Sequence, residues 1–134
     1  MIAGIGTDIL KMSDLSGDYL IAGDPFLVKT YAPREIEQAQ KRELPFYYYA
    51  TRFAGKEAVF KSLGISPQHV RMSEIEIIND SLGVPHVTLY GGLLQKAKEK
   101  GIHTVHISLS YEKDYASAFA VAEIREEDAR KERQ

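Results

Sequence analysis

Apolar and polar residues alternate with a period of two over several stretches of this 134-residue chain, as in strands that bury one face. The alternation is clearest over residues 105–110, where every second side chain is aliphatic. Residues 2–10 are expected to form a buried strand around Gly4 and Gly6, and glycine inside a strand favours close approach by another backbone or by a ligand. The pattern predicts strands over residues 2–10, 74–78, 86–90, 102–110 and 116–124.

A helical period replaces the alternation elsewhere, and proline and glycine mark the helix ends. Pro33 and Pro45 each suit the first turn of a helix, and Gly64 suits the C-terminal cap of the longer one. Between the first strand and the first helix no single period holds, although Ser13 and Asp24 could each cap a short helix and Gly17 and Gly23 each suit a turn. The pattern predicts helices over residues 33–42, 45–63 and 93–100.

The order of these elements indicates the fold class. A strand is followed by helices, a hairpin around the turn residues 79–85, a short helix and a second hairpin. This order favours an α+β fold over a parallel doubly wound sheet. The length fits one domain, so we expect a single domain over residues 1–124 and a solvated or frayed charged tail over residues 125–134.

Composition removes several classes of function. Hydrophobic residues make up 44% and charged residues 27%, and a net charge of −2 gives no global signature of nucleic-acid binding. Because cysteine is absent, disulfides, thiolate chemistry and cysteine zinc sites are excluded. The first residues lack a signal-peptide pattern, and no apolar run approaches the roughly 20 residues of a membrane span. We therefore expect a cytoplasmic protein with no membrane or nucleic-acid partner.

Glu57 lies on an apolar side of the longest predicted helix. At about 100° per residue, the arc around it includes Tyr49, Phe53 and Phe60. Burial of an ionised carboxylate without a partner costs roughly several kcal/mol. Lys61, one turn later, can pair with Glu57, but an exposed pair of this kind contributes only a few tenths of a kcal/mol. Either a cation meets Glu57, or the helix turns this side toward a cleft.

Asp8, in the first predicted strand, offers a second acid for such a cleft. Taken alone, it is more simply interpreted as a strand-end acid that caps a turn or pairs with a lysine. Together with Glu57 it fits Mg²⁺, which is commonly held by one or two protein carboxylates while waters and phosphates complete the octahedron. Lys61 lies within about 40° of Glu57 around the helix and is suited to neutralise charge on a leaving phosphate. Lys56, in contrast, points about 100° away from Glu57.

Two further groups of polar or aromatic residues are weaker indications of a site. His106, Ser108 and Ser110 share one face of a predicted strand, which suits a phosphate or ribose surface. The same alternation describes the solvated face of an antiparallel strand. The three tyrosines at 47–49 could stack on bases, but no basic residue interrupts them, and core packing is the favoured interpretation.

Four segments occur together in one order along the chain. They are Gly-Ile-Gly-Thr-Asp-Ile at 4–9, Arg-Phe-Ala-Gly-Lys-Glu-Ala-Val-Phe-Lys-Ser-Leu-Gly at 52–64, Glu-Ile-Glu-Ile-Ile-Asn-Asp at 74–80 with Gly83 and Pro85, and His-Ile-Ser-Leu-Ser at 106–110 followed by Tyr115 and Ala116. These segments resemble the opening strand, signature helix, central hairpin and closing strands of the bacterial holo-acyl-carrier-protein synthases, in the phosphopantetheinyl transferase superfamily. The resemblance implies an α+β fold in which a two-layer antiparallel sheet wraps on a long central helix.

The resemblance also implies an enzyme. Its members transfer the phosphopantetheine arm of coenzyme A to a serine of apo acyl carrier protein, releasing adenosine bisphosphate, in fatty acid biosynthesis. Carried over by position, Asp8 and Glu57 would hold the cofactor Mg²⁺ against the coenzyme A diphosphate. Lys61 would contact phosphate and assist departure of the nucleotide. Glu57, or a water held by the metal, is the candidate for removing the serine proton.

Other residues are assigned to substrate binding by the same resemblance. His106 and Ser108 would line the nucleotide site, and the turn from Gly83 to Pro85 would contact coenzyme A through its backbone. Bacterial relatives are typically trimers with sites at subunit boundaries, so we expect a homotrimer.

Acyl carrier proteins are acidic, so a basic docking surface is expected on this chain. Arg34, Arg42 and Arg52 are the candidates for contacts with the carrier protein. A solvated helix face explains the same charges about as well.

Two departures from the family pattern leave other functions open. This chain has Tyr111 where relatives often carry a His, and Lys11 stands where they have an acid and soon afterwards an arginine. An ammonium does not reproduce a guanidinium fork. One alternative is therefore a non-catalytic module that binds coenzyme A or a carrier protein. Another is a Mg²⁺-dependent hydrolase of nucleotide diphosphates.

Overall fold

The computed structural model describes residues 1–15, 23–69 and 71–125. Its strands are β1 (Ile2–Lys11), β2 (Ile75–Asn79), β3 (Pro85–Leu89), β4 (Ile102–Tyr111) and β5 (Tyr115–Ile124). Its α-helices are α1 (Pro25–Thr30), α2 (Pro33–Gln40), α3 (Pro45–Leu63) and α4 (Gly91–Glu99). Short 3-10 turns are η1 (Met12–Asp14), η3 (Pro67–His69) and η4 (Met72–Glu74).

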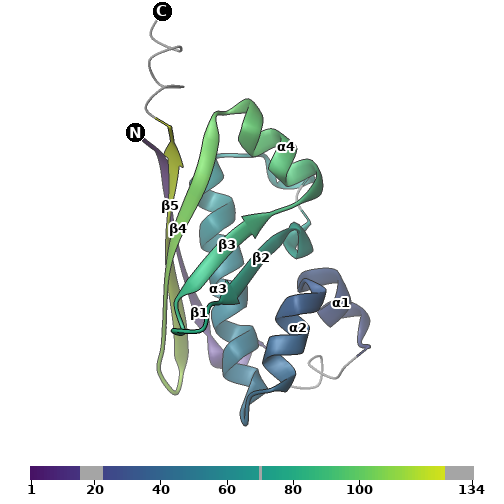
Figure 1. Cartoon of the computed structure of the whole chain (residues 1–134). Helices are drawn as coiled ribbons and strands as arrows, with labels where there is room; N and C mark the ends of the chain where they lie inside the picture. The colour runs from purple at the N-terminus through teal and green to yellow at the C-terminus, as the bar shows by residue number, and fades with distance from the viewer. Residues whose placement is uncertain (16–22, 70, 126–134) are drawn as a thin grey trace, which may run out of the picture.

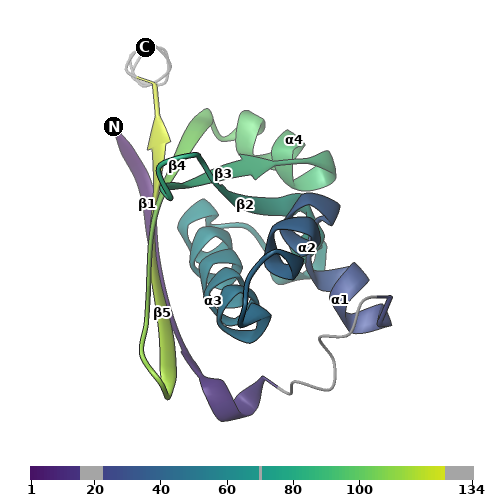
Figure 2. The same cartoon turned by 60° about the horizontal axis from the view of Figure 1, so that its bottom comes forward.

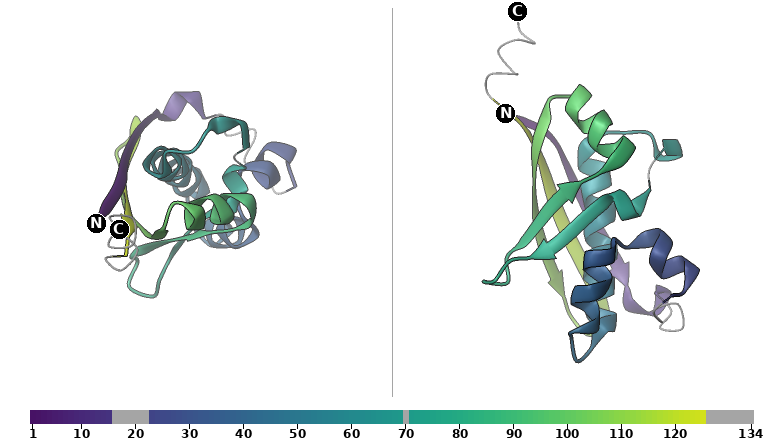
Figure 3. Two further views of the ribbon diagram at one scale, coloured as in Figure 1. Left: turned by 90° about the horizontal axis from the view of Figure 1, so that it is seen from above. Right: turned by 45° about the vertical axis from the view of Figure 1, so that its right-hand side comes forward.

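The long helix α3 lies between two antiparallel sheets (Figures 1 and 2). On one side is a three-stranded sheet of order β1-β5-β4, and on the other is the hairpin β2-β3. Strand β3 contacts β4, so the hairpin continues the wrap around the helix. The view from above shows α3 roughly end-on with the other elements around it (Figure 3). This arrangement confirms the predicted α+β fold.

Helix α3 is buried on almost every side because one sheet packs against it on each of two sides. Pro45 occupies its first turn, and Gly64 ends it in the left-handed conformation, at φ 63°. Its buried residues include Ala50, Ala54 and Ala58, which are small enough to let the layers approach. Among the described residues, no helix is long and apolar enough to cross a membrane.

Glycines set the distance between α3 and the sheets. A Cβ at Gly4 would overlap the backbone oxygen of Ser62, and one at Gly6 would overlap that of Ala58. The close approach predicted for these glycines is therefore an approach by the backbone of α3. Gly55 does the same on the hairpin side, where a Cβ would lie 2.7 Å from the Ile77 side chain.

The outer face of the three-stranded sheet is apolar and uncovered in the single chain. Ile5 and Ile9 of β1 are 71% and 70% exposed, and Phe119 of β5 is 63% exposed. Their strands are paired neighbours, since β1 and β5 are in antiparallel register. The prediction of a buried strand over residues 2–10 is therefore wrong for the single chain, because only the side of β1 that carries Gly4 and Gly6 packs on α3. Three large exposed side chains on one sheet face are typical of a surface that meets another protein.

The predicted strands and the three predicted helices are all present, with ends shifted by up to two residues. In the segment between β1 and α2, for which the sequence showed no single period, Asp24 caps α1 by accepting a hydrogen bond from the Phe26 amide over 2.8 Å. Ser13 lies inside η1, whose cap is Lys11, so it does not cap a helix. Gly17, also expected in a turn, and the tail beyond Arg125 lie outside the described residues.

Candidate functional site

Asp8, Glu57 and Lys61 meet where β1 lies against α3. Lys61 Nζ donates to the Thr7 carbonyl over 3.0 Å and to Asp8 Oδ1 over 3.3 Å. Asp8 and Lys61 are 53 residues apart in sequence. They can meet because glycine in β1 lets the strand lie directly on the helix backbone.

Asp8, Glu57 and Lys61 together form what we call the acid cluster. Its two carboxylates, those of Asp8 and Glu57, repel one another. Burial raises the pKa of Glu57 above its usual value, and the charge of Asp8 raises that pKa further. Lys61 lowers the pKa of Glu57, but its ion pair is with Asp8 rather than with Glu57. The simpler prediction for Asp8, an ion pair with a lysine, is thus also present in the structure. Even so, Lys61 does not offset the destabilisation of ionised Glu57.

The acid cluster fits a hard cation with few protein ligands. Among the described residues, no group of three or more His, Cys, Asp or Glu could hold a metal ion. Two carboxylates that destabilise one another are nevertheless suited to Mg²⁺, which takes its remaining ligands from water and phosphate oxygens. Asp8 and Glu57 are therefore the residues that would hold it.

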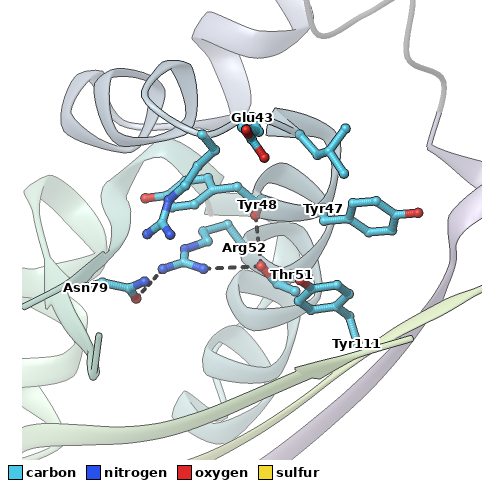
Figure 4. Close-up of a pocket in the computed structure, with 9 residues that line it drawn as sticks. Glu43, Tyr47, Tyr48, Thr51, Arg52, Asn79 and Tyr111 are labelled. Carbon is cyan, nitrogen blue, oxygen red and sulfur yellow. Dashed lines mark hydrogen bonds between the residues drawn. The ribbon is translucent and has the colours of Figure 1, made fainter. Parts of the chain in front are cut away.

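A groove lies between the hairpin, α3 and the end of β4. It consists of two adjoining cavities of about 350 Å³ and about 310 Å³. The first is lined by three predicted substrate-binding residues, Gly83, Pro85 and Ser108. Four residues line both cavities and join them: Thr51, Arg52, Asn79 and Tyr111. Figure 4 shows these four around the second cavity.

Arg52 is the central charge of this groove and is only 5% exposed. It donates to the Ile77 carbonyl, to Thr51 Oγ1 and to Asn79 Oδ1, and its guanidinium lies 3.9 Å from the centre of the Tyr48 ring. All these partners are neutral, and no described carboxylate forms an ion pair with Arg52. Burial therefore lowers its pKa. A buried cation with neutral partners favours an anionic ligand in the adjoining cavity.

The turn that carries Gly83 is held by Asp80. Asp80 Oδ1 accepts hydrogen bonds from the amides of Leu82 and Val84, over 2.9 and 3.0 Å. His86 Nε2 lies 2.8 Å from Asp80 Oδ2, and this hydrogen bond lowers the pKa of Asp80. Gly83 has φ 82°, which side-chain-bearing residues rarely adopt. The groove wall at Gly83 is thus a defined turn.

His106 is the one predicted substrate-binding residue outside both the groove and the acid cluster. Its Nε2 lies 3.7 Å from Glu123 Oε2 on the exposed face of the sheet. Ser108, two residues later, does line the groove.

The three arginines predicted for partner binding occupy different environments. Arg34 is exposed and pairs with Glu76 over 3.1 Å. Arg42 lies beside the Tyr48 ring, 5.5 Å from its centre, and lines the second cavity. Arg52 is buried in the groove wall, whereas a docking surface calls for exposed charges.

Lys56 has a structural role that the sequence pattern did not reveal. Its ammonium is buried and lies 2.5 Å from Glu35, which is also buried. Glu35 accepts a further hydrogen bond from the Ile77 amide over 3.0 Å. Burial raises the pKa of Glu35 and lowers the pKa of Lys56, while each partner opposes the shift of the other. The pair ties α2 and α3 to β2 and so supports the wall that holds Arg52.

Of the three tyrosines at 47–49, two pack as expected. Tyr48 and Tyr49 are buried. Tyr47 instead stacks on Tyr111 in the groove, with ring centres 5.2 Å apart. The sequence carried no local signal for this contact, because Tyr111 comes from a strand that is distant in sequence.

The sequence of this chain is similar to those of known proteins. The sequence model of the 4'-phosphopantetheinyl transferase superfamily matches residues 4–120. The holo-[acyl-carrier-protein] synthase of Syntrophus aciditrophicus is 39% identical over 124 residues, which cover 92% of this chain and 97% of the relative. That of Halothermothrix orenii is 37% identical over 92% of this chain and 98% of its own.

Solved structures agree with the sequence matches. The crystal structure of holo-[acyl-carrier-protein] synthase from Neisseria meningitidis superimposes with a TM-score of 0.82 at 35% identity, covering 92% of this chain and 99% of that one. The Bacillus anthracis enzyme, in complex with CoA (3',5'-ADP), gives a TM-score of 0.75 at 29% identity, with coverage of 93% and 99%.

Proposed function

Because the chain belongs to the holo-[acyl-carrier-protein] synthases of the 4'-phosphopantetheinyl transferase superfamily, we propose that it converts an apo acyl carrier protein to the holo form. The donor is coenzyme A, and the acceptor is a serine hydroxyl of the carrier. The serine oxygen forms a bond to the β-phosphorus of coenzyme A, the one that carries the pantetheine. The bond from that phosphorus to the bridging oxygen breaks, and adenosine 3',5'-bisphosphate leaves.

The observation that carries this proposal is the meeting of Asp8, Glu57 and Lys61 between β1 and α3. Asp8 and Glu57 are the residues that would hold Mg²⁺, which when bound supplies positive charge to the diphosphate oxygens. Glu57, with its pKa raised, is suited to take the serine proton. Lys61 Nζ is suited to donate a hydrogen bond to the leaving phosphate.

We assign the nucleotide half of coenzyme A to the groove. Gly83 and Pro85 present the turn, Ser108 lines the same cavity, and Arg52 presents a buried positive charge. A phosphate beside Arg52 gives that guanidinium the anionic partner that it lacks in the free chain. Arg34 and Arg42 remain our candidates for contacts with the acidic carrier protein.

We further propose that each active site combines two copies of the chain, in a homotrimer. The acid cluster lies at β1 and the groove lies at β4, the two outer strands of the three-stranded sheet. Arg52 and Glu57 are five residues apart on α3, so they point about 140° apart around the helix. The helix itself therefore separates the groove from the acid cluster within one chain. A second copy packed on the exposed Ile5, Ile9 and Phe119 surface would bring its groove to the cluster.

The direct test uses the mass of the carrier protein. The chain is incubated with coenzyme A, Mg²⁺ and an apo acyl carrier protein, and the carrier is weighed by mass spectrometry. A gain of one phosphopantetheine arm, with release of adenosine 3',5'-bisphosphate, is the expected result. Hydrolysis of coenzyme A with an unmodified carrier would instead favour the hydrolase, and binding without turnover would favour the binding module. A carrier whose target serine is replaced by alanine is the control.

A further inference from the structure

Tyr47 and Tyr111 form a stacked aromatic pair at one end of the groove. Their ring centres are 5.2 Å apart and their planes are inclined by 26°. Tyr47 comes from the first turn of α3, and Tyr111 is the last residue of β4. Both line the cavity of about 310 Å³ (Figure 4). Tyr111 is 57% exposed, so much of its ring remains open to a ligand.

The same cavity carries two arginines and one acid, Glu43. Arg42 and Arg52 both lie beside the Tyr48 ring, 5.5 and 3.9 Å from its centre, and both line the cavity. Thr51 also lines it and accepts a hydrogen bond from Arg52. Figure 4 shows Thr51 between the Arg52 guanidinium and the Tyr111 ring.

An aromatic surface and a buried guanidinium in one cavity are complementary to a nucleotide. A planar base stacks on a tyrosine ring, and a phosphate pairs with a guanidinium. An inorganic anion would use the arginines and leave the aromatic surface uncovered. An apolar ligand would leave the Arg52 charge without an anion.

We propose that Tyr111, held in place by Tyr47, stacks on the adenine base of coenzyme A and thereby selects a donor that carries the base. This inference rests on the proposed transferase function. The pair is already stacked in the free chain, so little side-chain freedom is lost when the base binds. Tyr111 is thus a specificity residue for the donor, and it lies in the groove rather than in the acid cluster of its own chain.

The first experiment compares two donors in the carrier-modification assay. Coenzyme A carries the base, and pantetheine 4'-diphosphate lacks the whole 3'-phosphoadenosine group. Tyr111→Ala should raise the KM for coenzyme A by about 5- to 100-fold and leave kcat at saturation unchanged. The KM for pantetheine 4'-diphosphate should not change. Tyr111→Phe, which keeps the ring, should behave as the wild type.

The matched control is Tyr115→Ala, because Tyr115 is an exposed tyrosine of the same hairpin and lines neither cavity of the groove. It should leave both KM values unchanged. If Tyr111→Ala raises the KM for both donors equally, the residue has a structural role and the stacking inference is wrong. The same conclusion follows if neither KM changes.

A binding measurement without turnover gives a second readout. Stacking on an aromatic ring quenches the fluorescence of 1,N6-etheno-coenzyme A. The bound probe should be quenched on the wild type and on Tyr111→Phe, and less quenched on Tyr111→Ala at equal saturation. Equal quenching on all three would overturn the inference even if the transferase is active. A wild type that modifies the carrier with neither donor would instead overturn the proposed function.

Discussion

Ionisation of Glu57 destabilises the folded state, because Glu57 is partly buried and faces the charge of Asp8. Because Glu57 lies in the middle of α3, the helix holds its side chain in this environment. A residue kept in a strained electrostatic state is a candidate for function. The same reasoning applies to Arg52, which is buried among neutral partners.

Glu57→Gln should leave the free energy of unfolding unchanged or increase it at neutral pH, while the rate of carrier modification falls roughly 10²- to 10⁴-fold. The pKa of Glu57 is raised in the folded state, so its destabilising effect is present above that pKa. The effect disappears as the pH falls below the pKa of the unfolded chain. The stability advantage of the variant should therefore shrink in acid.

Denaturant unfolding at neutral and acid pH, alongside the mass assay, measures both effects. The control is Glu37→Gln, an exposed glutamate whose only recorded ion pair, among the described residues, is with Lys41. A Glu57→Gln variant that is much less stable than the wild type at neutral pH would show that Glu57 is structural.

Arg52→Lys should weaken binding of adenosine 3',5'-bisphosphate about 10-fold or more. A lysine keeps the charge but loses the planar fork that bonds Ile77, Thr51 and Asn79 together. Isothermal titration calorimetry of the nucleotide measures the change. Arg71→Lys, at an exposed arginine outside the groove, should bind as the wild type does. Unaltered affinity in Arg52→Lys would place the nucleotide elsewhere.

At the scale of elements, the contact between β1 and α3 decides whether the acid cluster forms. The strand lies on the helix backbone only because Gly4 and Gly6 have no side chains at the contact. On the opposite side of α3, the buried pair of Glu35 and Lys56 fixes the helix against β2. The two contacts hold the acid cluster and the groove on different sides of one helix.

Gly6→Ala should destabilise the fold by about 1–3 kcal/mol, because the new Cβ would overlap the Ala58 carbonyl and force β1 away from α3. Transfer should fall as well, since Asp8 is two residues further along the strand. Urea unfolding and the mass assay measure these effects. Gly92→Ala is the matched control: it has open space around the new Cβ and should change stability by less than about 1 kcal/mol. Equal stability of Gly6→Ala and the wild type would contradict the close contact.

At the scale of the whole molecule, the question is whether one copy suffices for catalysis. Phe119→Asp should prevent assembly, because it places a charge on the exposed apolar face of the sheet. Light scattering after size-exclusion chromatography should then report a monomer, with transfer lost and a cooperative thermal transition retained. A monomeric wild type, or an active monomeric variant, would rule out the composite site.

Mixing two impaired variants, with coenzyme A below its KM, gives a sharper test of the same proposal. Glu57→Gln and Arg52→Lys each damage one half of the site. If each site takes Glu57 from one copy and Arg52 from its neighbour, subunit exchange between the variants creates some sites with both native residues. Partial recovery of transfer is then expected. No recovery, with exchange verified by mass spectrometry of the assembly, would place both residues in one chain's own site.

The sequence by itself determined the secondary structure and much of the chemistry of this protein. The period of two and the helical period predicted the five strands and α3, because those patterns depend on the local chain geometry. Glu57 was identified because a charge on an apolar helix face is a local anomaly. The four matching segments indicated the family, which the comparisons show.

Only the tertiary structure decided which side chains meet. The helical wheel gave the direction of Lys56 but not its partner, which is Glu35, 21 residues earlier. It likewise could not show that Arg52 is buried by the hairpin or that Tyr47 meets Tyr111. Local periodicity fixes the direction in which a side chain points from its element. What lies in that direction depends on the packing of segments that are remote in sequence.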